Sequence, residues 1–194
     1  EARIGTELVD QPEVEAAIRL TLGRAYRELA SFDLSEQNLR RADELLTKQR
    51  GDRDRQTLDA RTALLALLER MGRHQECVDS GRAVVETCRT ALGEDAPETL
   101  DAMTRLGACL LRVGRYPESE TCFRKALAGQ REHLGPEAGE TLVTMGALAQ
   151  TLKYEQKFVE AEKLAQTVYD VRRRTLGDDA PVVYESMHRL AAVW

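Results

Sequence analysis

Cysteine is the first residue type in this chain that could do chemistry, either as a nucleophile or as a metal ligand. The 194-residue sequence has four cysteines, and none forms a C-x-x-C pair or lies at zinc spacing from a histidine: Cys77, Cys88, Cys109 and Cys122. Cys109 and Cys122 could approach each other across one helical hairpin, but cytoplasmic thiols are normally kept reduced. The cysteines therefore predict a cytoplasmic protein with no disulfide and no metal site.

Histidine and glutamate are the other candidates for acid–base chemistry or metal binding. The three histidines lie far apart, at His74, His133 and His188, with no carboxylate partner at metal-ligand spacing. Four glutamates recur near predicted helix starts, where acidic side chains complement the helix dipole: Glu118, Glu120, Glu160 and Glu162. The sequence has no nucleotide-binding glycine loop and no Gly-x-Ser-x-Gly elbow. We expect no enzyme activity, no cofactor and no catalytic or metal site.

The overall charge narrows the class of partner. The formal net charge is -5, which argues against a general nucleic-acid binder. No run of about 18 apolar residues is present, so no membrane span is expected. The basic run from Arg172 to Arg174 is interpreted as a solvated helix end that suits the negative end of the helix dipole. Because the sequence begins at Glu1 rather than methionine, we interpret it as a fragment of a longer protein whose targeting signal cannot be read.

The elements that position these residues repeat with a fixed period. Gly93, Gly135 and Gly177 follow one another at intervals of 42 residues, and each follows a leucine. The same step relates the five leucines Leu22, Leu64, Leu106, Leu148 and Leu190, with no insertion. Apolar residues within each unit recur at helical spacing, which predicts two antiparallel helices per unit. We expect a lead-in over residues 1–11 and units over 12–53, 54–95, 96–137, 138–179 and, in part, 180–194.

Small residues are expected wherever the two helices of one unit approach closely. On the first helices these are Gly23, Gly107 and Ala149, with Leu65 as the bulky exception. Gly81, on the facing helix, is expected to make room for Leu65. Neither helix can bury its apolar face alone, so neighbouring units must stack into one continuous core.

The third unit carries the pattern of the tetratricopeptide repeat, with Met103, Leu106-Gly107, Leu110, Ser119, Phe123 and Ala126. The first and fourth units match it as well, and the resemblance covers about residues 12–194. The longer period and the Leu-Gly-x-x-x-Pro-x-Thr-Leu link resemble the kinesin light chain type, which also occurs in bacterial proteins, including C-terminal regions of serine/threonine kinases. The resemblance implies an all-α fold, a right-handed α-solenoid of stacked hairpins.

In this family the first helices line a concave groove that binds a peptide or a domain of another protein. Carried over by position, the resemblance implies a partner-binding groove of thirteen residues: Arg24, Arg27, Thr62, Arg70, Thr104, Arg105, Ala108, Arg112, Gln150, Lys153, Tyr154, His188 and Arg189. Six of the thirteen are arginines, whose planar fork suits carboxylates and phosphates. The partner is therefore predicted to be an acidic or phosphorylated peptide. The alternative is that these arginines pair with Asp59, Asp101 and Glu69 and only make the surface polar.

The chain also departs from the family. Kinesin light chain repeats carry an asparagine just before the Leu-Ala or Leu-Gly pair, and this chain has Thr21, Ala63, Arg105, Ala147 and Arg189 there. Neither a kinesin-type cargo peptide nor a chaperone tail is inferred. Two other functions stay open: a regulatory or substrate-recruiting segment of a larger signalling enzyme such as a bacterial kinase, and a self-association module using the cut-off fifth unit.

Overall fold

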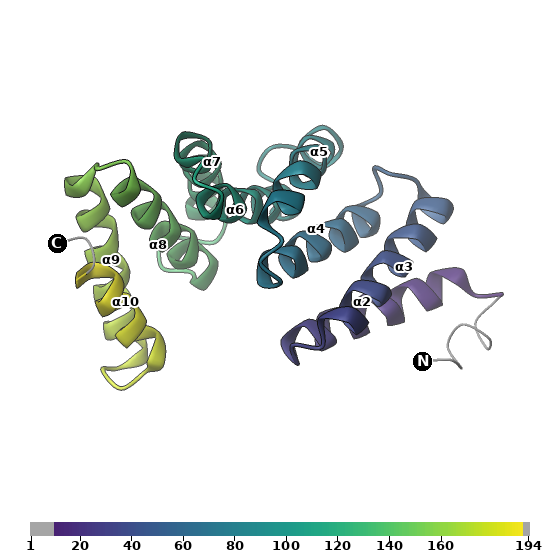
Figure 1. The fold of residues 1–194 in the computed structure, drawn as a ribbon, viewed down its shortest axis with the longest axis horizontal. Coiled ribbons are helices and arrows are strands. Elements are labelled where there is room, and N and C mark those ends of the chain that lie inside the picture. Colours follow the sequence, from purple (N-terminus) through teal and green to yellow (C-terminus); the bar gives the residue numbers. More distant parts are fainter. Residues whose placement is uncertain (1–9, 192–194) are drawn as a thin grey trace. The chain divides into compact units, whose positions relative to one another are not determined.

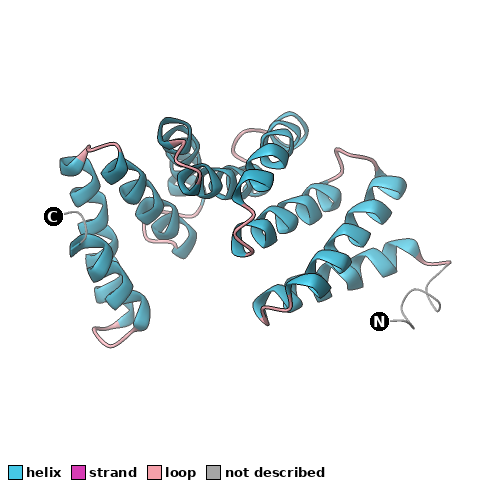
Figure 2. Ribbon diagram, viewed as in Figure 1, coloured by secondary structure: helices cyan, strands magenta, loops and turns pink. Residues whose placement is uncertain are grey.

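The computed structural model describes residues 10–191, and in that range it consists of α-helices joined by short turns, with no strand (Figure 2). The helices, labelled in Figure 1, are α2 (Pro12–Glu28), α3 (Phe32–Arg50), α4 (Arg55–Arg70), α5 (His74–Leu92), α6 (Pro97–Arg112), α7 (Tyr116–His133), α8 (Gly139–Tyr154), α9 (Phe158–Leu176) and α10 (Pro181–Ala191). The expected lead-in falls almost entirely outside the described residues, as does Trp194. The predicted all-α fold class is confirmed.

The chain divides into two compact units after Arg105, within α6, and each unit is described by itself. In unit 1, α2 pairs with α3 and α4 pairs with α5 as antiparallel hairpins, and α3 also packs on α4. In unit 2, α7 packs on α8, α8 pairs with α9, and α9 packs on α10. Consecutive helices are thus spatial neighbours, as a repeat array requires.

Proline and glycine set the helix limits. Pro12 opens α2 at a position where its missing N–H costs no hydrogen bond. The cap of α2 is Gln11, which makes no side-chain hydrogen bond. At the other end, Gly51 ends α3 with a φ of 87°, in the region that a residue without Cβ adopts most easily.

Threonine hydroxyl groups hold the link between successive hairpins. The Thr99 side chain donates from Oγ1 to the carbonyl oxygen of Gly93 at 2.8 Å, and Thr141 makes the same bond to Gly135 at 2.9 Å. Both threonines are fully buried. The bond fastens the turn after one helix to the first turn of the next. It gives a physical role to the threonine of the Leu-Gly-x-x-x-Pro-x-Thr-Leu pattern.

The two helices of a hairpin meet through one small and one large side chain. A Cβ added to Gly23 would lie 2.6 Å from Cγ of Leu39, and one added to Gly107 would lie 3.0 Å from the ring of Phe123. Both contacts are shorter than packed carbon atoms accept. Leu39 and Phe123 are fully buried, so they have no room to retreat. Glycine therefore lets these hairpins close around a large side chain.

A second row of small residues hydrogen-bonds across the same contact. Ser35 donates from Oγ to the carbonyl oxygen of Gly23 at 2.7 Å, and Ser119 donates to that of Gly107 at 2.8 Å. Both hydroxyl groups are buried and satisfied in this way. The small residues expected at the close approach are therefore there for two reasons, space and hydrogen bonding.

The leucines of the repeat row face the interior. Leu106 is 5% exposed and Leu148 is 1% exposed, and Leu148 belongs to the core of unit 2 with Phe123 and Met145. Leu64 is half-buried against Leu39 and the other residues of the unit 1 core. The row therefore supplies the apolar seam between hairpins.

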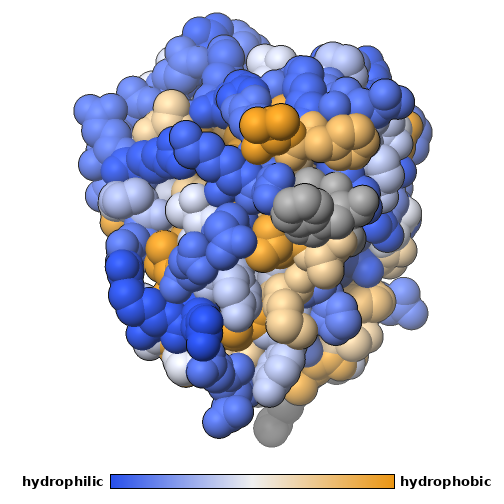
Figure 3. Space-filling view, turned by 90° about the vertical axis from the view of Figure 1, so that its left-hand side faces the viewer, coloured by the Kyte–Doolittle hydropathy of each residue, from blue (hydrophilic) through white to orange (hydrophobic). Residues whose placement is uncertain are grey.

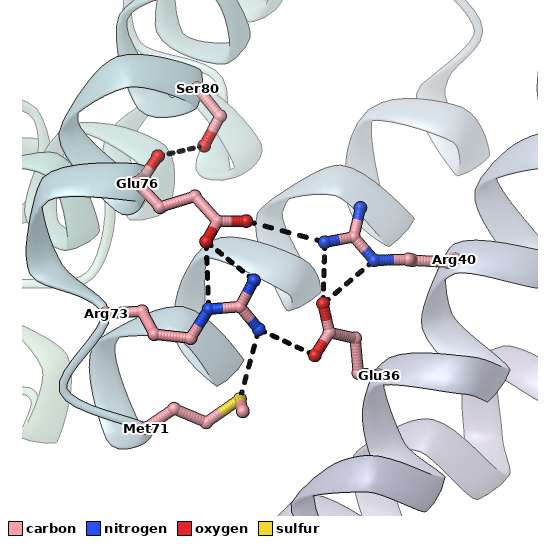
Figure 4. A network of polar contacts seen from close by, with 6 residues as sticks. All are labelled: Glu36, Arg40, Met71, Arg73, Glu76 and Ser80. Atoms are coloured by element: carbon pink, nitrogen blue, oxygen red, sulfur yellow. Dashed lines mark hydrogen bonds and ion pairs between the residues drawn. The ribbon is translucent and has the colours of Figure 1, made fainter.

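Networks of ion pairs join neighbouring hairpins on the side of the second helices. In unit 1, Figure 4 shows Glu36 of α3 accepting from Arg73 at 2.6 Å and from Arg40 at 2.6 Å, while Glu76 accepts from the same two arginines. Burial raises the pKa of Glu36, but hydrogen bonds from Arg40 and Arg73 outweigh it, so the pKa lies below its usual range.

Unit 2 repeats the network 84 residues further along the chain. Glu120 accepts from Arg124 at 2.8 Å and from Lys157 at 2.7 Å, and Arg124 also pairs with Glu160 at 2.8 Å. Burial opposes ionisation of Glu120, but these hydrogen bonds lower its pKa to about 2. Glu120 and Glu160 therefore connect α7 to α9, a tertiary role that the helix dipole alone does not describe.

Candidate protein-binding groove

The predicted groove residues divide between the two units. Unit 1 holds six of them: Arg24, Arg27, Thr62, Arg70, Thr104 and Arg105. Unit 2 holds the other seven: Ala108, Arg112, Gln150, Lys153, Tyr154, His188 and Arg189. As expected, all thirteen lie on the first helices of their hairpins, α2, α4, α6, α8 and α10. The two sets differ in how their charges are used.

The groove arginines of unit 1 are paired with carboxylates. Arg24 pairs with Asp59 of the neighbouring helix α4. Arg70 reaches Glu28 of α2 at 2.8 Å, where Arg27 also pairs. Hydrogen bonds from Arg27 and then Arg70 hold the pKa of Glu28 below its usual range. These cationic groups are therefore matched by negative charge before any partner binds.

Arg105, at the end of unit 1, is paired twice. Its guanidinium lies 3.2 Å from Glu69 and 3.2 Å from Asp101. Thr62 and Thr104 donate their hydroxyl groups to carbonyl oxygens one turn back in their own helices, at 2.9 Å each. The ion pairs that the alternative reading anticipated, with Asp59, Asp101 and Glu69, are thus all present in unit 1.

Unit 2 contains a cavity of about 270 Å³ that opens among α8, α9 and α10. Five of the seven predicted groove residues of this unit line it: Arg112, Gln150, Lys153, Tyr154 and Arg189. The other lining residues are Gly146, Ala149, Ala165, Val168 and Ser186. Ala108 instead packs against the core of unit 2, and His188 is exposed on α10 outside the lining.

The charged rim of this cavity differs from the groove of unit 1. Among residues 10–191, neither Arg112 nor Lys153 has a carboxylate within ion-pair distance. Arg189 pairs with Glu185, one turn earlier in α10, at 2.6 Å. The rim therefore presents two cations whose charge is not matched by a carboxylate contact, which favours an anionic ligand.

Aromatic and apolar groups complete the cavity. The ring of Tyr154 stacks on that of Tyr116, with centroids 5.1 Å apart and an angle of 6° between the planes. The floor is formed by Ala149, Ala165 and Val168, each at most 5% exposed. The cavity can thus hold an apolar group below and an anionic group at its mouth.

The sequence analysis did not predict that Ala149, Ala165 and Val168 line a cavity. Ala149 was expected only as a small residue at the contact between helices. The repeat pattern contained the information needed to predict this cavity. Ala165 lies 42 residues after Phe123, and Ala149 lies 42 residues after Gly107, so the fourth hairpin has a small residue at both facing positions.

The basic run at the end of α9 differs from its predicted solvation. Arg172 is half-buried and donates from Nη1 to Oγ of Ser186 in α10 at 2.9 Å. Burial lowers its pKa. Arg173 and Arg174 are exposed, and they pair with Asp178 and Glu137. The expectation of a solvated helix end is therefore wrong for Arg172, because α10 packs over it.

The other residue types that could do chemistry are histidine, cysteine, aspartate and glutamate. Between residues 10 and 191, no group of three or more histidine, cysteine, aspartate or glutamate side chains is placed to hold a metal ion. All four cysteines are free thiols, and burial raises the pKa of Cys88 to about 11, which makes it unreactive. No helix in this range is long and apolar enough to cross a membrane.

Comparison with known proteins places the chain in a family. The tetratricopeptide repeat model matches residues 64–132 and 98–174, more than half of the sequence. The chain therefore belongs to the tetratricopeptide repeat family, and the resemblance inferred from its motifs is confirmed. Comparison with curated proteins finds no match.

Solved structures agree with the kinesin light chain type. The nearly identical TPR-like repeats of a candidate kinesin light chain from Podosopora anserina superpose with a TM-score of 0.78 at 21% identity, covering 94% of this chain and 86% of that one. BtubC (BKLC) from P. vanneervenii superposes with a TM-score of 0.81 at 14% identity, covering 99% of this chain and 78% of that one. At these identities the likeness concerns the fold alone. Tetratricopeptide repeats generally mediate interactions between proteins.

Proposed function

We propose that this chain is a non-catalytic scaffold that binds an acidic segment of a partner protein at the first helices of unit 2. The segment is anchored at the cavity of unit 2 and carries carboxylates or phosphates. A cytoplasmic location fits the four free thiols, and the net charge of -5 is unfavourable for nucleic acid or an anionic membrane surface.

One observation carries this proposal: Arg112 and Lys153 line the cavity without a carboxylate partner among residues 10–191. In unit 1, by contrast, Arg24 and Arg70 each already hold one. Binding an anion at the cavity does not require an existing ion pair to break. An anion entering the groove of unit 1 would have to displace one.

The test measures binding of short fluorescent peptides to the full chain by anisotropy. Glutamate-rich and phosphoserine peptides are compared with a glutamine-rich peptide of equal length. We expect the acidic peptides to bind more tightly, and Arg112→Glu/Lys153→Glu to weaken them at least about tenfold, equivalent to ~1.4 kcal/mol. Raised salt should weaken binding as well, because the rim is exposed to solvent.

The matched control reverses two exposed charges elsewhere in unit 2. Arg131→Glu/Lys163→Glu changes the net charge by the same amount, and neither residue lines the cavity. We expect this variant to bind like the original chain, apart from a small long-range effect. Equal losses in both variants, or no preference for acidic peptides, would refute the proposal.

A second candidate function is self-association through α10. Tyr184 is 50% exposed and Met187 is 43% exposed, whereas Leu142 and Met145, 42 residues earlier, are 5% and 1% exposed. Figure 3 views the face of unit 2 around α9 and α10 and shows apolar side chains gathered among hydrophilic ones. Sedimentation velocity at several concentrations tests this candidate. Self-association would be excluded if the original chain sediments as a monomer at every concentration and Met187→Glu has the same sedimentation coefficient.

A further inference from the structure

The cavity of unit 2 lies where the other hairpins carry a large side chain. At the two facing positions, the first hairpin has Gly23 and Leu39, the second Leu65 and Gly81, and the third Gly107 and Phe123. In each of these hairpins one large residue fills the space, and Leu39, Leu65 and Phe123 are at most 1% exposed. The fourth hairpin has Ala149 and Ala165 at these positions.

Neither alanine fills the space between α8 and α9, and both line the cavity. Side chains of the neighbouring helices do not fill this space either, since a cavity of about 270 Å³ remains. An engineered apolar cavity of about 150 Å³ is already large enough to bind benzene. The space is therefore sufficient for one aromatic or branched aliphatic side chain.

Gly146 keeps the entrance to this space open. The equivalent residues of α2, α4 and α6 are Leu20, Thr62 and Thr104. A Cβ added to Gly146 would lie 3.5 Å from Nη1 of Arg189, so glycine leaves the room in which this guanidinium lies at the rim. The opening thus combines an apolar floor with a cationic edge.

We propose that the fourth hairpin is a socket for one large apolar side chain of the bound partner. This side chain takes the place that Phe123 and Leu39 occupy in their own hairpins, between Ala149 and Ala165. The inference rests on the proposed function, because the same partner segment supplies the anionic group at the rim. The rim then selects charge, and the socket selects size.

The size of the space supports a peptide side chain rather than a small-molecule cofactor. Pockets for drug-sized ligands usually measure about 300–1,000 Å³, and this cavity is smaller. Its floor is formed by Ala149, Ala165 and Val168, and the one equally buried polar side chain in the lining is Ser186. The Ser186 hydroxyl already donates to the carbonyl oxygen of Val182 and accepts from Arg172, so affinity at the floor depends mainly on apolar contact.

The experiment compares two small probes by NMR on the full chain. Propionate and 3-phenylpropionate carry the same carboxylate, but only the second has an aromatic ring. We expect 3-phenylpropionate to bind at least about tenfold more tightly, since even a methylene in an apolar pocket can be worth that factor. The amide signals of Gln150, Ala165 and Val168 should shift. Equal affinity for the two probes would overturn the inference.

A filled socket provides the matched variant. Ala149→Gly/Ala165→Phe copies the pair Gly107 and Phe123, which packs in the third hairpin of the same chain. We expect it to keep its helical circular dichroism spectrum and to lose the preference for 3-phenylpropionate. If it does not fold, Gly146→Thr, which brings in the residue of α4 and α6, narrows the entrance instead. A preference that persists in a folded variant would contradict the socket.

The failure of the socket is distinguishable from that of the acidic groove. The filled variant keeps Arg112 and Lys153, so binding of a glutamate-rich peptide through charge alone should survive in it. The inference is supported if the filled variant loses the preference for 3-phenylpropionate over propionate but still binds the glutamate-rich peptide more tightly than the glutamine-rich one. A charge preference without any ring preference in the original chain refutes the socket and leaves the proposed function standing. If neither preference is present, both are wrong.

Discussion

The closest approach between two helices, at Gly23, gives the sharpest stability prediction. Replacing Gly23 by alanine removes a flexible residue from the interior of α2, which alone would stabilise a helix by about 1 kcal/mol. The new Cβ, however, would lie 2.6 Å from Cγ and 2.7 Å from Cδ2 of Leu39, which is fully buried. Overpacking of this kind costs roughly 1–3 kcal/mol, and the very short distances favour the upper end. We expect Gly23→Ala to lose about 1–2 kcal/mol of unfolding free energy.

The assay is urea unfolding followed by circular dichroism at 222 nm. Gly139→Ala is the control, because Gly139 is also helical but a Cβ there meets nothing within 4 Å. The control should be neutral or slightly stabilising, up to about 1 kcal/mol. The swap Gly23→Leu/Leu39→Gly copies the order found at Leu65 and Gly81, and it should recover much of the loss. Gly23→Ala with unchanged or raised stability would refute the packing argument.

Three further predictions concern single interactions. Glu120 has a pKa of about 2 in the folded chain, below its unfolded value, so its stabilisation is complete above pH 4.5 and is lost as the pH falls toward 2; urea midpoints across this range should fall less in Glu120→Gln. Gln156 has a φ of 61° where the second and third hairpins have glycine, and Gln156→Gly should raise the unfolding free energy by about 1 kcal/mol in the same assay. Arg19 lies 2.7 Å from Glu15, which is 4% exposed and also lies 3.5 Å from Arg41, and Arg19→Met should cost about 1–3 kcal/mol by removing the closer of these two cations. Rescue by Glu15→Thr, the residue of the next three repeats, would separate this cost from lost packing, and an unchanged midpoint in Arg19→Met would contradict it.

The repeat pattern made the fold class and the family predictable because the same apolar and small residues recur at the same helical positions in several units. One unit with Leu106-Gly107 and Phe123 would be a weak signal. The recurrence of Leu64, Leu106 and Leu148 at one step means that each hairpin must bury the same seam against its neighbour. The recurrence of small residues at one position of each unit likewise predicted where the two helices of a hairpin approach closely. Helix limits were less predictable, because the repeat pattern gives the bounds of each unit and not the residue at which a helix such as α3 begins, Phe32.

The sequence predicted which helices carry the candidate groove residues but not which of their charges are paired. The helical register places Arg24, Arg70 and Arg112 on one face of their helices, and the sequence says no more. The carboxylate that meets Arg24 lies 35 residues away, and the one that meets Arg70 lies 42 residues away. Whether such a pair forms depends on how neighbouring helices bring two long side chains together.

The sequence by itself determined that this protein is an array of helical hairpins of the tetratricopeptide repeat family. Apolar residues that recur at helical spacing in every 42-residue unit can be buried together only when successive hairpins pack against each other. Only the tertiary structure decided that the arginines of unit 1 are neutralised and that Arg112 and Lys153 are not. It also decided that the space between Ala149 and Ala165 stays open, because closure of a gap depends on side chains from three helices at once. Local periodicity dictates which residues face inward, whereas the charges and spaces left over are set by contacts between residues far apart in the chain.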